Sequence, residues 1–411
     1  MCRSARRHDR DGGPSVTDPS VHFVIAGYPP SIGGAQIQTQ VLARELARRG
    51  SDVRVSCHWR ETRTDWVLGT TVRLPDGRRR ETDDGVPVDQ VGLRDGRRMT
   101  DVLLAPLYYP LRSPVARRFA SRLDFDDGGE AICHIVRMGR EHLALRAMQG
   151  ARAAGRPVVV TPYHHERWSR RPDPVWRHVY QRADLVVAMT AAEVELLAGV
   201  GVDPERVIVT GVSPVLSDGA DAGDTRAALE LPDGELITFL GQQYPYKGVD
   251  IAIGAFERVA AARRDATLVI AGPPTARTKR LVSRSPQSNS IRVVGPLTLA
   301  HKTGLLAASS ALVLPSSQES FGGVILEAVA MGCPYVVSDL PQLREVHEAI
   351  RFGAVAARDP AAFAEALEAL LEAPPADHDA ARERVLTRFS ANALADRHVE
   401  AYARLTRDTR D

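Results

Sequence analysis

The sequence has no apolar run that approaches the roughly 20 residues a membrane-spanning helix needs. Cysteine is also scarce: only Cys2, Cys57, Cys133 and Cys333 occur, and no two of them form a CxxC pair. This spacing argues against a zinc site or a disulfide framework and favours a reduced, cytoplasmic protein. The formal net charge is only +2, so the charge balance gives no case for binding nucleic acid.

The length of the chain, 411 residues, is enough for two domains of about 150 residues or more each. Hydrophobic residues make up 44%, which is typical of a globular protein. The start of the chain is polar and lacks the apolar core of a secretory signal, so we expect residues 1–20 to form a disordered leader.

Short β-branched runs alternate with amphipathic helices in both halves of the chain, which predicts parallel sheets with crossover helices on both faces. The predicted strands of the first half are VHFVIAG, DVRVSC, ICHIVRM, PVVVTPY, DLVVAMT and RVIVTGV. Those of the second half are LITFLG, TLVIAG, IRVVG, ALVLPS and YVVSD. The fold class is therefore α/β, with two Rossmann-like domains facing each other across a cleft.

The predicted boundary between the domains is a segment rich in Asp, Gly, Pro and Ala at residues 213–234. It divides an N-terminal domain at residues 21–213 from a C-terminal domain at 214–389. The final segment, 390–411, is helical in pattern, and we expect it to pack back on the first domain. The charged stretch 62–129 shows no regular pattern and receives no assignment.

The run SSQESFGGVILEAVAMGCP predicts a helix that begins near Gly322 and follows the strand ALVLP. The unpaired N–H groups at its start, with Gly322 and Gly323 lacking Cβ atoms, favour an anion such as phosphate. Glu319 and Glu327 flank this helix end and suit neutral sugar hydroxyls. A solvated surface loop with two glutamates fits the same pattern.

Two further loops follow strands at a cleft edge. In FLGQQYPYKG, Lys247 opens a helix where its ammonium would neutralise a leaving phosphate, although a lone lysine is more often solvated. In AGYPPSIGGAQ, Gly33 and Gly34 form a glycine turn that resembles a phosphate-binding loop but is not GxGxxG.

Together these loops resemble the GT-B-type glycosyltransferases of the large retaining family four, glycosyl transferases group 1. The resemblance spans nearly the whole chain from Val21. It includes the GG-A-Q loop, the Lys-Gly that opens the second domain, and the E-x7-E of Glu319 and Glu327 around F-G-G. The segments RADLVVAMTAAEVELL and PERVIVTGVSP fall where this family has a late strand and the interdomain hinge.

The resemblance implies that Lys247 contacts the donor diphosphate, Glu319 holds hydroxyls of the donor sugar, and Glu327 holds the ribose. The base is expected near Gly272 and Gly295. The family usually has an arginine where this chain has Gln242, which puts donor affinity or donor identity in doubt. The full donor-binding set that the resemblance implies is Gly33, Gly34, Gln242, Lys247, Glu319, Phe321, Gly322, Gly323 and Glu327.

Histidines near the first domain's strand ends are candidates for contact with the donor sugar or the acceptor. His164 and His165 follow the strand PVVVT, and we favour His164, which completes a predicted catalytic set with Lys247 and Glu319. His134 lies within a strand, where a structural role is the more common one. His134 and His165 stay as candidate acceptor residues.

Two other patterns carry less weight. DFDD at residues 124–127 resembles a metal-binding DxD, but it precedes a strand in a Gly/Asp-rich loop and is interpreted as a solvated turn. We expect no metal site and no cofactor. The basic, aromatic stretch 108–123 fits a plain surface helix and also fits contact with an anionic membrane or an acidic acceptor.

The resulting hypothesis is a retaining, metal-independent hexosyltransferase. It transfers a sugar from a nucleotide-diphosphate sugar to a hydroxyl acceptor, which is a small molecule, a glycan or a lipid-linked group. Two alternatives stay open, namely a sugar-nucleotide epimerase of the same fold and a non-catalytic nucleotide-sugar-binding subunit. The expected location is the cytoplasm, with peripheral contact at the inner membrane face left open. The sugar, base, acceptor, pathway and oligomeric state are not specified by the sequence.

Overall fold

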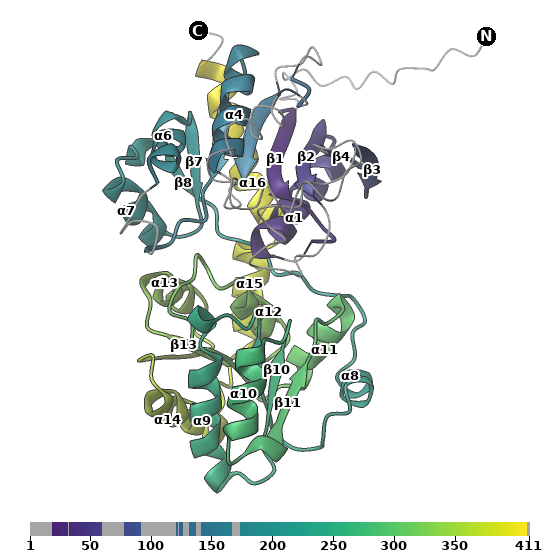
Figure 1. Ribbon diagram of the computed structural model, residues 1–411, viewed down its shortest axis with the longest axis vertical. Coiled ribbons are helices and arrows are strands. Elements are labelled where there is room, and N and C mark those ends of the chain that lie inside the picture. Colours follow the sequence, from purple (N-terminus) through teal and green to yellow (C-terminus); the bar gives the residue numbers. More distant parts are fainter. Residues whose placement is uncertain are drawn as a thin grey trace, which may run out of the picture.

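The computed structural model describes residues 19–31, 33–59, 78–91, 121, 123–125, 131–136, 141–166 and 173–408. Two sheets form the framework, one from each half of the chain (Figure 1). The predicted stretch 108–123 lies outside the described residues except for Ser121 and Leu123, and so does most of the leader. Among the described residues, every helix falls short of the length and apolarity that a bilayer crossing demands.

The first sheet has eight strands in the order β3-β4-β2-β1-β5-β6-β7-β8, and all pairs are parallel except the β3–β4 hairpin. Its central strands are buried along their whole length, which is expected where helices cover both faces of a parallel sheet. The strands are β1 (Val21–Gly27), β2 (Val53–Trp59), β3 (Arg79–Asp83), β4 (Val86–Gln90), β5 (Ile132–Val136), β6 (Val158–Thr161), β7 (Leu185–Ala188) and β8 (Val207–Val209).

The second sheet has six parallel strands in the order β11-β10-β9-β12-β13-β14. The order reverses direction between β9 and β12, and such switch points are where ligands bind in open α/β sheets. The strands are β9 (Leu236–Leu240), β10 (Thr267–Ala271), β11 (Ile291–Val294), β12 (Ala311–Leu314), β13 (Tyr335–Ser338) and β14 (Gly353–Ala356).

Helices cross over between the strands and begin at residues suited to cap them. Thr190 caps the helix after β7, Thr298 the helix after β11, and Asp359 the helix after β14. The helices are α1 (Gly34–Arg48), α4 (Glu141–Ala153), α6 (Pro174–Arg182), α7 (Ala191–Gly199), α8 (Ala222–Ala228), α9 (Val249–Ala262), α10 (Ala276–Arg284), α11 (Leu299–Ala308), α12 (Gly323–Ala330), α13 (Pro341–Ile350), α14 (Pro360–Glu372), α15 (His378–Arg388) and α16 (Ala391–Asp408).

The α/β fold class predicted from the sequence is confirmed, and every predicted strand is present. Three strands were not predicted, and each has a physical reason. β3 is the charged, largely exposed edge segment RRETD, and β4 pairs with it inside the stretch that had no assignment. β14 is GAVA, a short run with little β propensity that is held by its pairing with β13.

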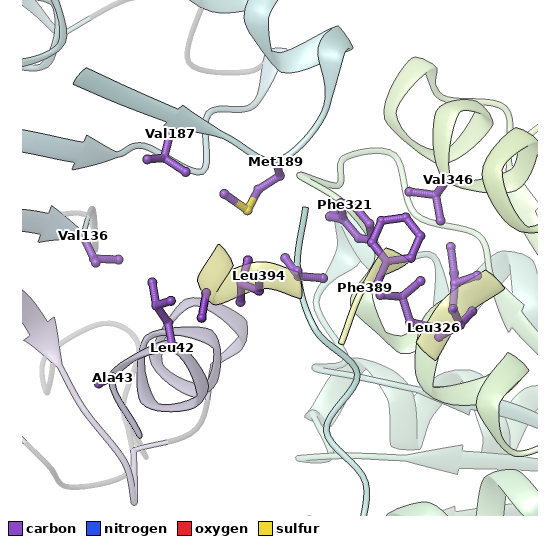
Figure 2. Close-up of a cluster of buried hydrophobic side chains, with 14 of the residues drawn as sticks. Leu42, Ala43, Val136, Val187, Met189, Phe321, Leu326, Val346, Phe389 and Leu394 are labelled. Atoms are coloured by element: carbon purple, nitrogen blue, oxygen red, sulfur yellow. The ribbon is translucent and has the colours of Figure 1, made fainter. Parts of the chain in front are cut away.

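The C-terminal helix α16 leaves the second domain and packs on α1 of the first, where it lies behind the first sheet (Figure 1). Its residues Leu394, His398 and Tyr402 are buried, and Arg49 of α1 bonds Asp396 at 2.7 Å. One continuous apolar cluster runs from α1 through Met189 and Leu394 to Phe321 and Phe389 (Figure 2). The two domains therefore share part of a core.

His398 and His134 are buried in that junction, with ring centroids 5.9 Å apart. The pKa of His398 is lowered to about 4, mainly because the ring is buried. A hydrogen bond to Leu394 O acts to raise the pKa, and the charge of Arg397 acts to lower it. Burial also lowers the pKa of His134 well below its usual value. Both imidazoles are therefore neutral in the folded protein at pH 7.

We predict that these histidines make the protein sensitive to acid. The unfolded chain binds their protons near pH 6.5, so stability is complete above that pH. It then falls as the pH drops toward 4, by about 2–3 kcal/mol for His398 alone. Urea unfolding at pH 7, 5.5 and 4.5 measures this loss. The His398→Gln variant should show a flatter pH dependence, and an unchanged slope would contradict the assignment.

Candidate functional site

The helix end predicted to bind an anion forms as expected. β12 ends at Leu314, and α12 begins after Gly322, which has φ +82°. The backbone conformation favours glycine there, and a Cβ atom on Gly322 would lie 2.8 Å from Leu343 Cδ2, so the Leu343 side chain would have to shift. No side chain of the described residues caps this helix end. Its first N–H groups are therefore available to a ligand.

Lys247 and Glu319 form a close ion pair beside this helix end. Lys247 Nζ lies 2.6 Å from Glu319 Oε1, and Ser316 Oγ donates to the same oxygen at 2.8 Å. Burial acts to lower the pKa of Lys247, but the charge of Glu319 outweighs it and the pKa is raised. The ammonium therefore stays protonated in a mostly buried position.

The loops that carry this pair are joined through backbone. Lys247 ends a short 3-10 turn, η3 (Pro245–Lys247), and the Ser317 N–H donates to Tyr246 O at 2.7 Å. Gly248 follows with φ +77°, and a Cβ atom there would lie 2.1 Å from Pro315 O. Close contact between the loops after β9 and β12 thus depends on a glycine at this position.

Glu327 has a cationic partner that sequence reasoning missed. Lys302 Nζ on α11 lies 2.6 Å from Glu327 Oε1 and also donates to Val215 O at 2.7 Å. The Val215 N–H donates to the same carboxylate oxygen at 3.3 Å. Burial raises the pKa of Glu327, and Lys302 opposes that effect. The sequence held one signal for this contact, namely that the chain has only three lysines, Lys247, Lys279 and Lys302. Two of them form ion pairs with Glu319 and Glu327 in the structure.

We predict that Lys302→Met lowers the free energy of unfolding by about 1–2 kcal/mol at pH 7, because Glu327 loses its charged partner. The cost is limited because the carboxyl group can take up a proton instead. The deficit should therefore shrink at pH 5. Urea unfolding at both pH values measures it, with Lys279→Met at an exposed position as the control. Equal deficits at the two pH values would contradict this role.

The glycine turn of the first domain lies next to the interdomain linker. Gly34 is the first residue of α1, and no atom lies within 4 Å of a Cβ built on it. Gln38, one turn later, donates to Ser213 O at 2.7 Å and accepts from the Ser213 N–H at 2.8 Å. α1 is thus held to the chain segment that enters the second domain.

The predicted base site brings three loops together. Gly272, with φ +125°, donates from its N–H to Gly295 O at 3.2 Å. Gln243 is buried, and its Nε2 donates to Gly272 O at 3.0 Å. Gln242, where the resemblance leads one to expect arginine, is half-buried in the loop just after β9. The loops after β9, β10 and β11 therefore meet at one edge of the sheet.

The histidines divide differently from the prediction. The His164 ring is buried edge-to-face on Tyr180, and the backbone N–H of His164 donates to the Glu193 carboxylate. His165 is half-buried and its Nδ1 lies 3.4 Å from Ser320 Oγ in the second domain. This geometry argues against the preference for His164, because the adjacent His165 is the residue that faces the other domain.

His134 is placed in the core of the first domain. Its Nδ1 lies 2.6 Å from Tyr402 Oη and its Nε2 lies 2.6 Å from Thr161 Oγ1. Only 1% of the residue is exposed. This environment is that of a structural residue, and the acceptor role considered for His134 stays a prediction. In the described ranges, no three His, Cys, Asp or Glu residues gather as a metal-binding group.

Comparison with known families accounts for this arrangement. Residues 33–212 match the family model described as glycosyl transferase 4-like domain, and residues 234–373 match that of glycosyl transferases group 1. The two matches together span most of the chain, and they confirm the resemblance to the glycosyl transferases group 1 family seen in the sequence.

Curated relatives are 28–33% identical to the chain over the segments that align. It is 32% identical over 265 residues to D-inositol 3-phosphate glycosyltransferase 2 of Catenulispora acidiphila, covering 58% of this chain and 61% of the relative. It is 28% identical over 346 residues to D-inositol 3-phosphate glycosyltransferase of Jonesia denitrificans, covering 75% of each. A third relative, from Frankia alni, is matched over 55% of its length. The match thus spans less than two thirds of the Catenulispora and Frankia proteins.

Solved structures share the fold. Anabaena HepE in complex with UDP and glucose superposes with a TM-score of 0.71 at 17% identity, covering 94% of this chain and 99% of that one. Sucrose-phosphate synthase from Thermosynechococcus elongatus gives 0.73 at 16% identity, covering 95% and 100%. At these identities the likeness establishes the GT-B fold alone.

Proposed function

We propose that the protein is a retaining glycosyltransferase that transfers a sugar from a nucleotide-diphosphate sugar to a hydroxyl acceptor. The observation that carries this proposal is the pairing of Lys247 with Glu319 beside the uncapped N-terminus of α12. A cation and a free helix end together suit a diphosphate, and the carboxylate beside them suits sugar hydroxyls.

The chemistry follows from where charge develops. Negative charge accumulates on the leaving diphosphate as the sugar bond breaks, and Lys247 with the α12 N–H groups stabilises it. Glu319 shares one oxygen with Lys247 and Ser316, which holds the carboxylate in place while it accepts from the sugar. The acceptor attacks on the face that the diphosphate leaves, and the leaving phosphate takes the acceptor proton. No protein nucleophile is needed.

Glu327 is assigned to the ribose of the donor. Lys302 and the Val215 N–H engage its Oε1, and this anchors the side chain to α11 and to the interdomain linker. A ribose hydroxyl would complete the hydrogen bonding of the same carboxylate. Donor binding would thus contact a residue tied directly to the segment between the domains.

The acceptor class is proposed from the relatives. The curated proteins named above are inositol-phosphate glycosyltransferases, so inositol phosphate is the first acceptor to test here. His165 lies at the interdomain edge and is the described histidine best placed to approach a bound sugar.

The test is a product assay. The protein is incubated with UDP-, GDP- and ADP-sugars and inositol phosphate in the presence of EDTA, and NMR reports the anomeric configuration of the product. We expect consumption of one donor and retention of configuration. An inverted product would sink the retaining mechanism. Epimerised donor without acceptor would favour an epimerase, and donor binding without turnover would favour a non-catalytic subunit.

A further inference from the structure

A cavity lies between the domains and is lined by residues of both. Its volume is about 100 Å³. Met189 and Thr210 of the first domain, Phe321 and Glu345 of the second, and Arg388 and Arg397 at the α15–α16 junction line it. Figure 2 shows Met189, Phe321, Phe389 and Val346 around this junction.

Arg397 is the unusual residue of this cavity. Its Nη1 donates to Arg388 O at 3.0 Å, but Nε and Nη2 are buried and have no hydrogen-bond partner among the described residues. Burial, and next the charge of Arg388, lower the pKa of Arg397. The charge of the neighbouring Asp396 opposes this shift without reversing it. A buried guanidinium without a hydrogen-bonded anion is costly, and the second arginine adds repulsion.

The carboxylate on the opposite wall does not relieve this charge. Glu345 Oε1 accepts from the Ala191 N–H at 3.0 Å, and Oε2 accepts from the Ala192 N–H at 3.2 Å. These N–H groups form the N-terminus of α7, so Glu345 caps a helix of the other domain. Arg397 and Arg388 thus face a cavity whose acidic residue is already engaged.

We propose that this cavity, which we call the hinge cavity, binds a small oxyanion of the phosphate class through Arg397 and Arg388. The planar guanidinium fork matches a phosphate or carboxylate group with two hydrogen bonds, and a shared anion cancels the repulsion between the two arginines. The cavity has room for one phosphate group, and Lys247, Glu319 and Glu327 are not among the residues that line it. The ligand is therefore distinct from the donor.

The hinge cavity is placed to regulate the site. Its walls come from both domains, and its lining residue Phe321 immediately precedes Gly322, the N-cap of α12. An anion held by the α15–α16 junction favours the domain arrangement in which these walls stay together. Donor affinity should then depend on phosphate concentration, and the coupling is reciprocal.

The test measures binding of inorganic phosphate to a protein whose donor site is disabled. Thermal shift and calorimetry are run on Lys247→Ala and on Lys247→Ala/Arg397→Gln, with ionic strength held constant by chloride. We expect saturable stabilisation of the first protein and a Kd raised about tenfold or more in the second. Lys247→Ala/Arg404→Gln is the control, since Arg404 lies on the same helix and pairs only with exposed Glu400.

Two results would overturn the proposal. One is the absence of saturable phosphate binding by Lys247→Ala, and the other is unchanged binding when Arg397 is replaced. Should Arg397→Gln not fold, Arg388→Gln provides the same comparison. Without phosphate binding, equal effects of Arg397→Gln and Glu345→Gln on unfolding would indicate an Arg397–Glu345 ion pair instead. None of these measurements requires glycosyl transfer, so the result for phosphate binding at the hinge cavity is independent of the result for the proposed activity.

Discussion

Lys247→Met is expected to lower kcat by about 10²–10³-fold, the usual loss when one preorganised donor to a developing anion is removed. The methionine keeps the length and apolar stem of lysine but carries no charge. Glu319 then lies at 9% exposure without its ammonium partner, which places an uncompensated carboxylate next to the incoming diphosphate. Both effects act on the same step, because negative charge increases there as the sugar bond breaks.

Steady-state kinetics with the donor identified by the product assay measure this loss, and circular dichroism checks the fold. Lys279→Met is the matched control because Lys279 is exposed on α10. A kcat of Lys247→Met within twofold of the parent protein, together with a raised KM, would mean that Lys247 stabilises the bound donor and the transition state by the same amount. The role in leaving-group stabilisation would then be wrong.

Gly248→Ala is expected to destabilise the second domain by about 2–4 kcal/mol. The residue has φ +77°, and its new Cβ would lie 2.1 Å from Pro315 O, a backbone atom that cannot rotate away. The clash between this Cβ and Pro315 O can be removed only if the loops after β9 and β12 move apart. Lys247 and Glu319 would move apart with them, so donor binding should weaken more than stability alone explains.

Thermal unfolding and donor titration of Gly248→Ala measure the two effects. Gly219→Ala separates the contributions, since Gly219 has φ +69° but open space around its Cβ position. It should show only the cost of the left-handed conformation, about 1 kcal/mol. Equal losses in the two variants would show that contact with Pro315 has no part in holding the loops.

The fold was predictable because its signals are local. Buried parallel strands are continuous β-branched runs such as VHFVIAG and TLVIAG, and the helices between them carry their own caps and apolar faces. β3 and β14 were missed because their pairing, rather than their residues, makes them strands. A segment such as RRETD has no apolar face from which a strand is inferred.

Helix geometry alone predicts which candidate site residues lie close together only where they are neighbours in the sequence, and the placement of Lys247 beside them came from the family resemblance. Glu319, Gly322, Gly323 and Glu327 share one loop and helix, so their proximity followed from helix geometry. Lys302 comes from a separate helix, and its contact with Glu327 depends on how α11 packs against α12. The choice between His164 and His165 depends on a turn at Tyr163, which has φ +46°. Such a turn is not evident from residue types alone.

The C-terminal helix has a consequence for the order in which this protein is made. Tyr402 bonds His134 in the first domain, and Leu394 and His398 fill space beside α1 and β5. Because α16 follows every strand of both sheets in the sequence, Leu394, His398 and Tyr402 are synthesised after both sheets. The first domain, although synthesised first, is therefore the last to complete its core. Until then it exposes apolar surface that the second domain cannot cover.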